Sequence, residues 1–267
     1  MNPRDRWDER LAIRCIGSEL GVEVVVHDDG SEQSMYDLII VYPDRPPGAV
    51  EVTAAADPDA IALGRLVYDA ERWIVPDIVG GWAASVRPTA RWRDIQARLP
   101  ALLRAMEGQG VLRAEPEIWW QPGPYDEELE ALGILHLMQS GTDFPGSVYL
   151  IIEQGLERTA GAVPTSGRPL IEWLAEWFDR ADKTDNLRKL DAAGAEERHL
   201  FLILPSFAEA PFAVTDLLSR DGAPLPEDSP QLPREVSHVW VVSTWSSGSG
   251  VRWSPDGGWS RFDKPGD

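Results

Sequence analysis

The chain has 267 residues, with 44 acidic and 25 basic side chains, a formal net charge of −19 and a hydrophobic content of 43%. This length is enough for one large domain or two smaller domains with a buried core, and the composition is that of a globular protein rather than a disordered one. The strong negative charge opposes nonspecific binding to nucleic acids and to anionic membranes.

A single cysteine, Cys15, excludes an intramolecular disulfide and a cysteine-rich zinc site, as is typical of a reducing compartment. The first residues are charged and lack the apolar stretch of a secretory signal, and no apolar run reaches the roughly 18 residues needed to span a bilayer. We therefore expect a cytoplasmic protein without a membrane partner. Only three of the 25 basic residues are Lys, which is typical of proteins from GC-rich genomes such as those of actinobacteria.

The negative charge is distributed unevenly along the chain. Residues 1–110 carry 12 Arg and 18 acidic residues, whereas residues 111–267 carry 13 basic and 26 acidic residues. We expect residues 1–110 to form one core, which would contain any surface for nucleic acid. We expect residues 111–267 to form an extension of that core or a second domain, with an acidic surface for a protein partner.

The first 110 residues predict the order helix, three strands, helix, strand, helix. Apolar residues repeat at helical spacing over residues 4–20, and Gly21 ends this helix. Strands are expected at 22–28, 36–42 and 49–53, then a helix from 57 to about 73, a strand at 81–86 and a helix at 89–107 that Pro100 kinks or divides.

The remaining residues predict strands that alternate with helices. Helices are expected at about 126–139, 169–178, 184–193 and 210–219, and strands at 147–153, 198–204 and 237–243. This alternation favours parallel βαβ connections. A PDGG turn near the C-terminus predicts a hairpin with Trp253 opposite Trp259. The fold class is therefore α/β, in three layers around a central mixed sheet.

The four histidines lack the HxxxH or HxH spacing of a zinc site. His199 and His238 each lie near the start of a predicted strand and would meet if those strands are adjacent, which we interpret as a structural contact. The chain contains no GxSxG, GxxxxGK[ST] or GxGxxG sequence, so a serine-hydrolase or nucleotide-binding function has no support.

Two carboxylates, Asp37 and Glu51, lie within otherwise apolar strand sequences. If these strands pair so that residue numbers sum to about 90, Ile39 lies opposite Glu51 and Asp37 opposite Thr53, and these odd-numbered residues share one face. Two neighbouring carboxylates raise each other's pKa unless a cation lies between them. Mg²⁺ or Mn²⁺ suits this position, and such an ion activates water for phosphodiester hydrolysis.

A structural explanation of the same carboxylates is also open. Asp37 could cap the turn before its strand, and Glu51 could pair with a neighbouring arginine such as Arg14 or Arg45.

The element order, with Asp37 in YDL and Glu51 and Thr53 in EVT, resembles the PD-(D/E)xK nuclease core over residues 4–107. The resemblance implies a restriction-endonuclease-like αβββαβ core. It also implies a phosphodiesterase in which Asp37 and Glu51 hold Mg²⁺ or Mn²⁺ and Thr53 orients water.

A first-helix glutamate completes many sites of this family, which implies Glu9 as a third metal ligand, with Glu19 in reserve. Thr53 stands where the family has Lys, and a hydroxyl cannot supply the positive charge of that Lys. Lys189 or Arg87 could substitute for it.

Two hypotheses follow for the function. In the first, the protein is a nuclease whose Arg91 and Arg98, beside the apolar stripe of the helix at 89–107, contact the nucleic-acid backbone; the alternative for these arginines is a solvated helix edge. In the second, the protein is a non-catalytic, nuclease-like protein that acts through protein contacts as an inhibitor, immunity factor or scaffold. The acidity and the missing Lys favour the second hypothesis.

Overall fold

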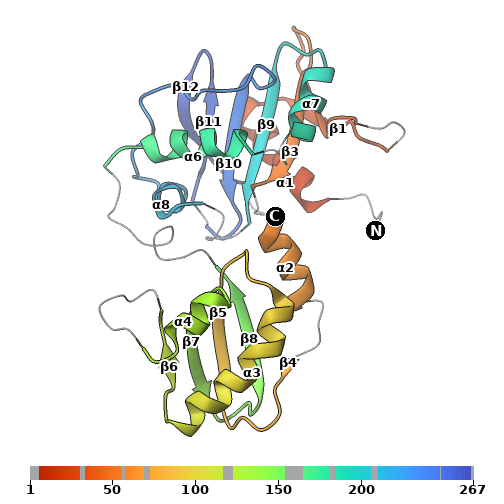
Figure 1. Cartoon of the computed structure of the whole chain (residues 1–267). Helices are drawn as coiled ribbons and strands as arrows, with labels where there is room; N and C mark the ends of the chain where they lie inside the picture. Colours follow the sequence, from red (N-terminus) through yellow and green to blue (C-terminus); the bar gives the residue numbers. More distant parts are fainter. Residues whose placement is uncertain are drawn as a thin grey trace. The chain divides into compact units, whose positions relative to one another are not determined.

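The computed structural model describes residues 6–30, 34–55, 58–68, 73–116, 123–153, 165–180, 184–205, 210–246 and 248–265. These residues form a mixed α/β fold with two mixed sheets (Figure 1). The chain divides into two compact units: unit 1 is Met1–Ala55 with Gly161–Asp267, and unit 2 is Ala56–Ala160. In the sequence, unit 2 is therefore an insertion into unit 1.

Within the described residues, unit 1 contains a seven-stranded sheet in the order β1-β2-β3-β9-β10-β11-β12. Its strands are β1 (Glu23–Val26), β2 (Leu38–Val41), β3 (Gly48–Ala54), β9 (Arg198–Leu204), β10 (His238–Ser243), β11 (Gly250–Ser254) and β12 (Gly258–Phe262). The pairs β3–β9 and β9–β10 are parallel, and the other neighbouring pairs are antiparallel.

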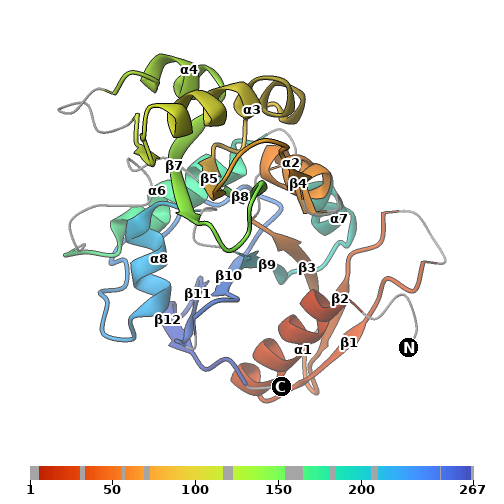
Figure 2. The ribbon, with the colours of Figure 1, turned by 90° about the horizontal axis from the view of Figure 1, so that it is seen from below.

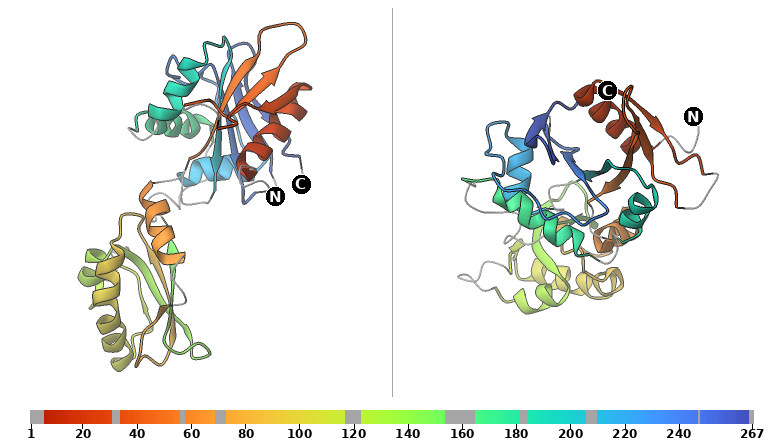
Figure 3. Two further views of the ribbon diagram at one scale, coloured as in Figure 1. Left: turned by 90° about the vertical axis from the view of Figure 1, so that its right-hand side faces the viewer. Right: turned by 90° about the horizontal axis from the view of Figure 1, so that it is seen from above.

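Helices cover both faces of this sheet. They are α1 (Trp7–Leu20), α6 (Arg168–Phe178), α7 (Thr184–Ala192) and α8 (Phe212–Ser219). Helix α1 packs through Ala12, Cys15 and Ile16 on one face, and α6, α7 and α8 pack on the other, as Figures 2 and 3 show. The predicted three-layer α/β class with a central mixed sheet is therefore confirmed for unit 1.

Unit 2 has its own sheet, in the order β4-β8-β5-β7-β6, and its own core. Its elements are α2 (Pro58–Tyr68), β4 (Trp73–Ile74), β5 (Gly81–Val86), α3 (Trp92–Gly108), β6 (Arg113–Ala114), α4 (Asp126–Ala131), β7 (Ile134–Gly141) and β8 (Ser147–Ile152). Helix α3 buries its apolar stripe, which includes Ile95 and Leu99, against one face of the sheet (Figure 1). Among the described residues, no helix has the length and apolar character that crossing a membrane requires.

Two local predictions are confirmed. Helix α1 ends at Gly21, whose φ of 64° is the left-handed conformation that glycine adopts without strain. Trp253 pairs with Trp259 across the C-terminal hairpin. Both depend on short-range turn chemistry, which is readable from the sequence.

The place of the strand at 81–86 differs from the expectation. It was expected to complete the same core as the first three strands, but as β5 it lies in the sheet of unit 2, and β9 instead pairs with β3 in parallel. The division into compact units accordingly differs from the expected boundary at residue 110. The physical reason is that β3 finds its parallel partner only after an insertion of about a hundred residues.

Two helix predictions also need correction. The helix expected at 126–139 ends at Ala131, because Gly133 adopts a φ of 71° and the following residues pair with β5 as strand β7. Pro100 does not divide α3, which runs without interruption over its 17 residues. The continuous apolar stripe of α3 outweighs the loss of one backbone hydrogen bond at Pro100.

The register of β2 and β3 is two residues away from the expected one. Ile39 lies opposite Ala49 rather than opposite Glu51, because the turn between the two strands is centred one residue earlier in the chain than expected. The prediction that Asp37 faces Thr53 is therefore wrong. A shift of two residues preserves the alternation of faces, and extending the observed register by one residue sets Asp37 across from Glu51.

Candidate functional site

Asp37 lies directly before β2 and is buried. Its Oδ2 accepts a hydrogen bond of 2.7 Å from the backbone N–H of Val52 in β3. The carboxylate thus bonds across the strand pair, and not within the preceding turn as the structural explanation supposed. Its other oxygen, Oδ1, is buried without a hydrogen-bond partner.

Glu51 is buried in the middle of β3. Its neighbours Val50 and Val52 pack on the α1 side, so its side chain faces the layer that contains α7. There the Nζ of Lys189 donates a hydrogen bond of 2.9 Å to Oε1 of Glu51, whereas Oε2 is buried without a hydrogen-bond partner. Lys189 was one of the two residues expected to substitute for the missing Lys, and its ammonium group lies beside the carboxylate of Glu51.

Glu9, on the first helix, is buried as well and lies near Asp37. Arg6 connects the two: its Nη1 is 3.3 Å from Oε1 of Glu9 and 3.8 Å from Oδ1 of Asp37. We call Glu9, Asp37, Glu51, Lys189 and Arg6 together the acidic cluster. All five residues belong to unit 1.

The electrostatics of the acidic cluster are those of carboxylates short of cations. Burial, followed by the charge of Asp37, raises the pKa of Glu51 to about 8 and that of Glu9 to about 7. Burial also raises the pKa of Asp37, although the Val52 N–H opposes the shift. Burial lowers the pKa of Lys189, but the hydrogen bond and charge of Glu51 outweigh it and raise that pKa. The cluster therefore favours an additional positive charge.

The other sequence-predicted residues lie outside this cluster. Thr53 is on the same face of β3 as Glu51, but its hydroxyl donates to the carbonyl of Ala54 at 3.5 Å. Glu19, the reserve ligand, pairs instead with Arg252 at 2.9 Å. Arg87, Arg91 and Arg98 belong to unit 2, where Arg91 and Arg98 are exposed, so the acidic cluster is built without them.

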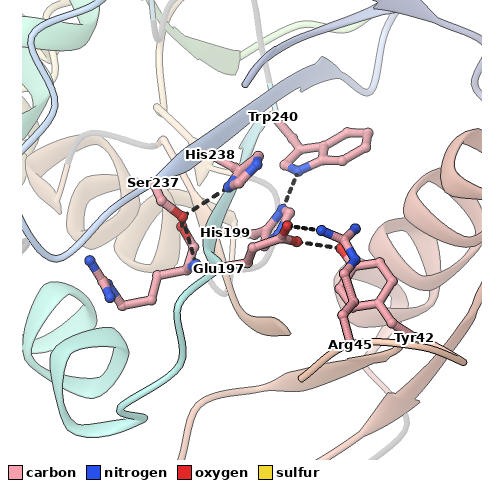
Figure 4. Close-up of polar contacts among 8 residues, drawn as sticks. Tyr42, Arg45, Glu197, His199, Ser237, His238 and Trp240 are labelled. Atoms are coloured by element: carbon pink, nitrogen blue, oxygen red, sulfur yellow. Dashed lines mark hydrogen bonds and ion pairs between the residues drawn. The ribbon is translucent and has the colours of Figure 1, made fainter. Parts of the chain in front are cut away.

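A second cluster lies on the α1 face of the same sheet. We call Glu197, His199 and His238 the histidine cluster (Figure 4). The two histidines are register partners on β9 and β10, and their rings stack with centroids 4.2 Å apart, so the expected contact between them is confirmed. Nε2 of His199 lies 3.2 Å from Oε2 of Glu197.

The possible ligand atoms of the histidine cluster all lie within 4.8 Å of one another, so the group could hold a metal ion. Within the described part of the chain, Glu9, Asp37 and Glu51 are not this closely spaced. A metal ion is therefore favoured by the close spacing of ligand atoms in the histidine cluster, and by the unpartnered oxygens in the acidic cluster.

Hydrogen bonds already occupy most polar atoms of the histidine cluster. The indole N–H of Trp240 donates to Nδ1 of His199 at 3.1 Å, which assigns the ring proton to Nε2 and directs it to Glu197. Glu197 also accepts from Tyr42 at 2.5 Å and from Arg45 (Figure 4). An ion on Nε2 of His199 would have to displace this proton and with it the Trp240 hydrogen bond.

The pKa values in the histidine cluster agree with this assignment. Burial lowers the pKa of His199, and burial is also the largest cause that lowers the pKa of His238 to about 3. The hydrogen bond from His199 is the largest cause that lowers the pKa of Glu197 to about 2.

The sequence identified the three carboxylates of the acidic cluster and named Lys189 among two substitutes. It missed Arg6 and Glu197. The i, i+3 spacing of Arg6 and Glu9 was a usable signal for an ion pair at the start of the first helix. Glu197 has no such signal, since its partners Tyr42 and Arg45 lie more than 150 residues away in the sequence.

Comparisons of the chain with models of protein families, with curated proteins and with solved structures find no match.

Proposed function

We propose that unit 1 is a phosphodiesterase that depends on Mg²⁺ or Mn²⁺ and cleaves nucleic acid, with the acidic cluster as its active site. One observation carries the proposal: Asp37 Oδ1, directly before β2, and Glu51 Oε2, in the neighbouring strand β3, are buried oxygens without hydrogen-bond partners. Buried polar atoms are almost always satisfied, so two adjacent exceptions of the same charge call for a ligand. A divalent cation with oxygen preference fits them.

When bound, the cation polarises a phosphoryl oxygen and lowers the pKa of a coordinated water. The chain's own groups have separate roles. The Val52 N–H fixes Asp37 by one oxygen and leaves the other free, and Lys189 does the same for Glu51. Glu9 adds a third carboxylate from the first helix.

Lys189 also supplies the positive charge that Thr53 cannot. Its ammonium group is held by Glu51 in a partly buried position, where it stabilises negative charge that develops on a phosphate. In the resemblance to the PD-(D/E)xK core, Lys189 thus takes the part of the family Lys from α7 instead of β3. The αβββαβ core would then consist of helix α1, the strands β1, β2 and β3, helix α7 and strand β9. Unit 2 would be inserted between β3 and the following helices.

The non-catalytic alternative has one observation in its favour. Lys189 and Arg6 already place two cations against the carboxylates, which reduces the need for a metal. In that case the acidic cluster is a closed ion-pair network, and the protein acts through contacts with a protein partner.

Cleavage and metal binding separate the two functions. Purified protein is incubated with single- and double-stranded DNA and with RNA, in Mg²⁺, in Mn²⁺ and in EDTA, and Mn²⁺ binding is measured by calorimetry. We expect cleavage in the presence of metal only. Arg188→Met, which removes an exposed cation from the same helix as Lys189, and Glu172→Gln, which removes an exposed carboxylate, are matched controls and should leave cleavage unchanged.

Lys189→Met should abolish cleavage while Mn²⁺ still binds, because the lysine acts on the substrate and not as a ligand. The absence of both Mn²⁺ binding and cleavage in the wild-type protein would reject the enzyme and select the non-catalytic function.

A further inference from the structure

Arg6 is placed where a cation of the proposed active site would act. It directly precedes α1, and its guanidinium lies between carboxylates from two different elements, 3.3 Å from Glu9 and 3.8 Å from Asp37. The contact with Asp37 is longer than a hydrogen bond, so Oδ1 of Asp37 keeps no hydrogen-bond partner. Arg6 therefore neutralises the pair by charge without satisfying Oδ1 of Asp37.

The side chain of Arg6 can leave this position at little cost. It is 57% exposed, whereas the side chains of Glu9 and Asp37 are 8% and 2% exposed. A partly exposed ion pair contributes little to stability, since water replaces most of its interaction. The two carboxylates are buried and the arginine is not, so the arginine is the partner that can be displaced into solvent.

We propose that Arg6 is an internal counter-cation, which occupies the space between Glu9 and Asp37 in the metal-free protein and is displaced when a divalent cation binds. The inference rests on the proposed function, because it needs the acidic cluster to bind a metal. Its consequence is competition: Arg6 lowers the metal affinity of the site and prevents the carboxylates from repelling each other when no metal is present.

The test measures Mn²⁺ binding by calorimetry in the full-length protein and in Arg6→Gln, Arg6→Lys and Arg168→Gln. Arg168→Gln is the control, since it removes an exposed arginine that pairs with Glu172 on α6, away from the acidic cluster. We expect Arg6→Gln to tighten Mn²⁺ binding about twofold to fivefold, which is the upper part of the range for removal of one partly exposed competing ion pair. Arg6→Lys should bind with nearly wild-type affinity, and the control should not differ from wild type.

Thermal unfolding provides a second readout that does not depend on activity. Without metal, Arg6→Gln should unfold at a lower temperature than wild type, and saturating Mn²⁺ should remove this difference. Asp37→Asn in the Arg6→Gln background should abolish the gain in affinity, which assigns the binding to the acidic cluster and not to the histidine cluster.

The outcomes distinguish this inference from the proposed function. If wild type binds Mn²⁺ and Arg6→Gln binds it equally or more weakly, Arg6 is not a competitor, and only the counter-cation role is overturned. If Arg6→Gln binds Mn²⁺ and wild type does not, the counter-cation role is supported, but the proposed function of the wild-type protein is rejected. If neither binds, the acidic cluster is not a metal site and both proposals fail.

Discussion

Glu51 and Lys189 of the acidic cluster lie on the opposite face of the sheet from the histidine cluster, near the same pair of strands. His199 is the register partner of Val50, and Glu51 is the next residue in β3. Both clusters bury ionisable groups, but in the histidine cluster Trp240, Tyr42 and Arg45 supply donors for them. In the acidic cluster two oxygens have no donor.

This difference shows that two properties of a buried polar site give separate information. One is the distance between possible ligand atoms, and the other is whether each polar atom has a hydrogen-bond partner. The histidine cluster has the closer spacing, yet hydrogen bonds already occupy most of its polar atoms, which favours the metal-free state. The acidic cluster is more loosely spaced but electrostatically incomplete, which is the condition that a ligand improves. Perturbed pKa values occur in both clusters, so they do not by themselves separate a structural network from a functional site.

The largest expected effect is on cleavage. Asp37→Asn and Glu51→Gln should each reduce metal-dependent cleavage by more than about 100-fold, because each removes an anionic ligand of the proposed site. Glu197→Gln, the matched change in the histidine cluster, should change cleavage by less than about twofold when it is assayed below its unfolding temperature. Equal losses from Glu51→Gln and Glu197→Gln would remove the functional distinction between the clusters.

The next largest effect is on the free energy of unfolding, and it tests whether the Trp240 hydrogen bond holds the histidine cluster together. Trp240→Phe should lower the free energy of unfolding by about 2 to 4 kcal/mol, because it leaves Nδ1 of His199 buried without a donor and also reduces packing. It also frees the ring to carry its proton on Nδ1, so Zn²⁺ binding should appear or strengthen. Urea unfolding with and without Zn²⁺ measures both. Unchanged stability would show that the Trp240 hydrogen bond does not hold the network.

The two clusters should respond to pH in opposite directions. The pKa of Glu51 is raised to about 8 in the folded protein, so the folded state binds more protons than the unfolded state between about pH 4.5 and pH 8. Stability from Glu51 therefore falls as the pH rises through this window in the absence of metal. Glu51→Gln should flatten the fall, which chemical denaturation at a series of pH values would detect.

Glu197 provides the opposite case. Its folded pKa is lowered to about 2, so its contribution to stability is present above about pH 4.5 and is lost as the pH falls toward 2. Glu197→Gln should therefore reduce stability at pH 6 by more than at pH 3. A variant that loses equal stability at both pH values would show that ionised Glu197 is not what the network stabilises.

The smallest effect is expected at Thr53. Thr53→Val should change cleavage by less than about threefold, since the hydroxyl is directed to the carbonyl of Ala54 and not to the cluster. Kinetics under saturating Mg²⁺ measure it. A loss comparable with that of Lys189→Met would restore Thr53 as the group that orients water.

Much of unit 1 was predictable from local patterns. The period-2 alternation in residues 49–53 predicted that Glu51 points away from Val50 and Val52, and the PDGG turn predicted the pairing of Trp253 with Trp259. The prediction of one helix over 126–139 was wrong, because the apolar residues of β7 fit the helical repeat as well as the strand repeat. Only Gly133 marks the change from helix to strand.

The sequence by itself determined most helices and strands, the α/β class and the face on which each strand residue lies, because these follow from backbone periodicity and turn chemistry over a few residues. Only the tertiary structure decided that Lys189 reaches Glu51 across 138 residues and that β9, and not β5, lies beside β3. No local pattern encodes such pairings, since they depend on which buried surfaces fit together after an entire second unit has been inserted between them.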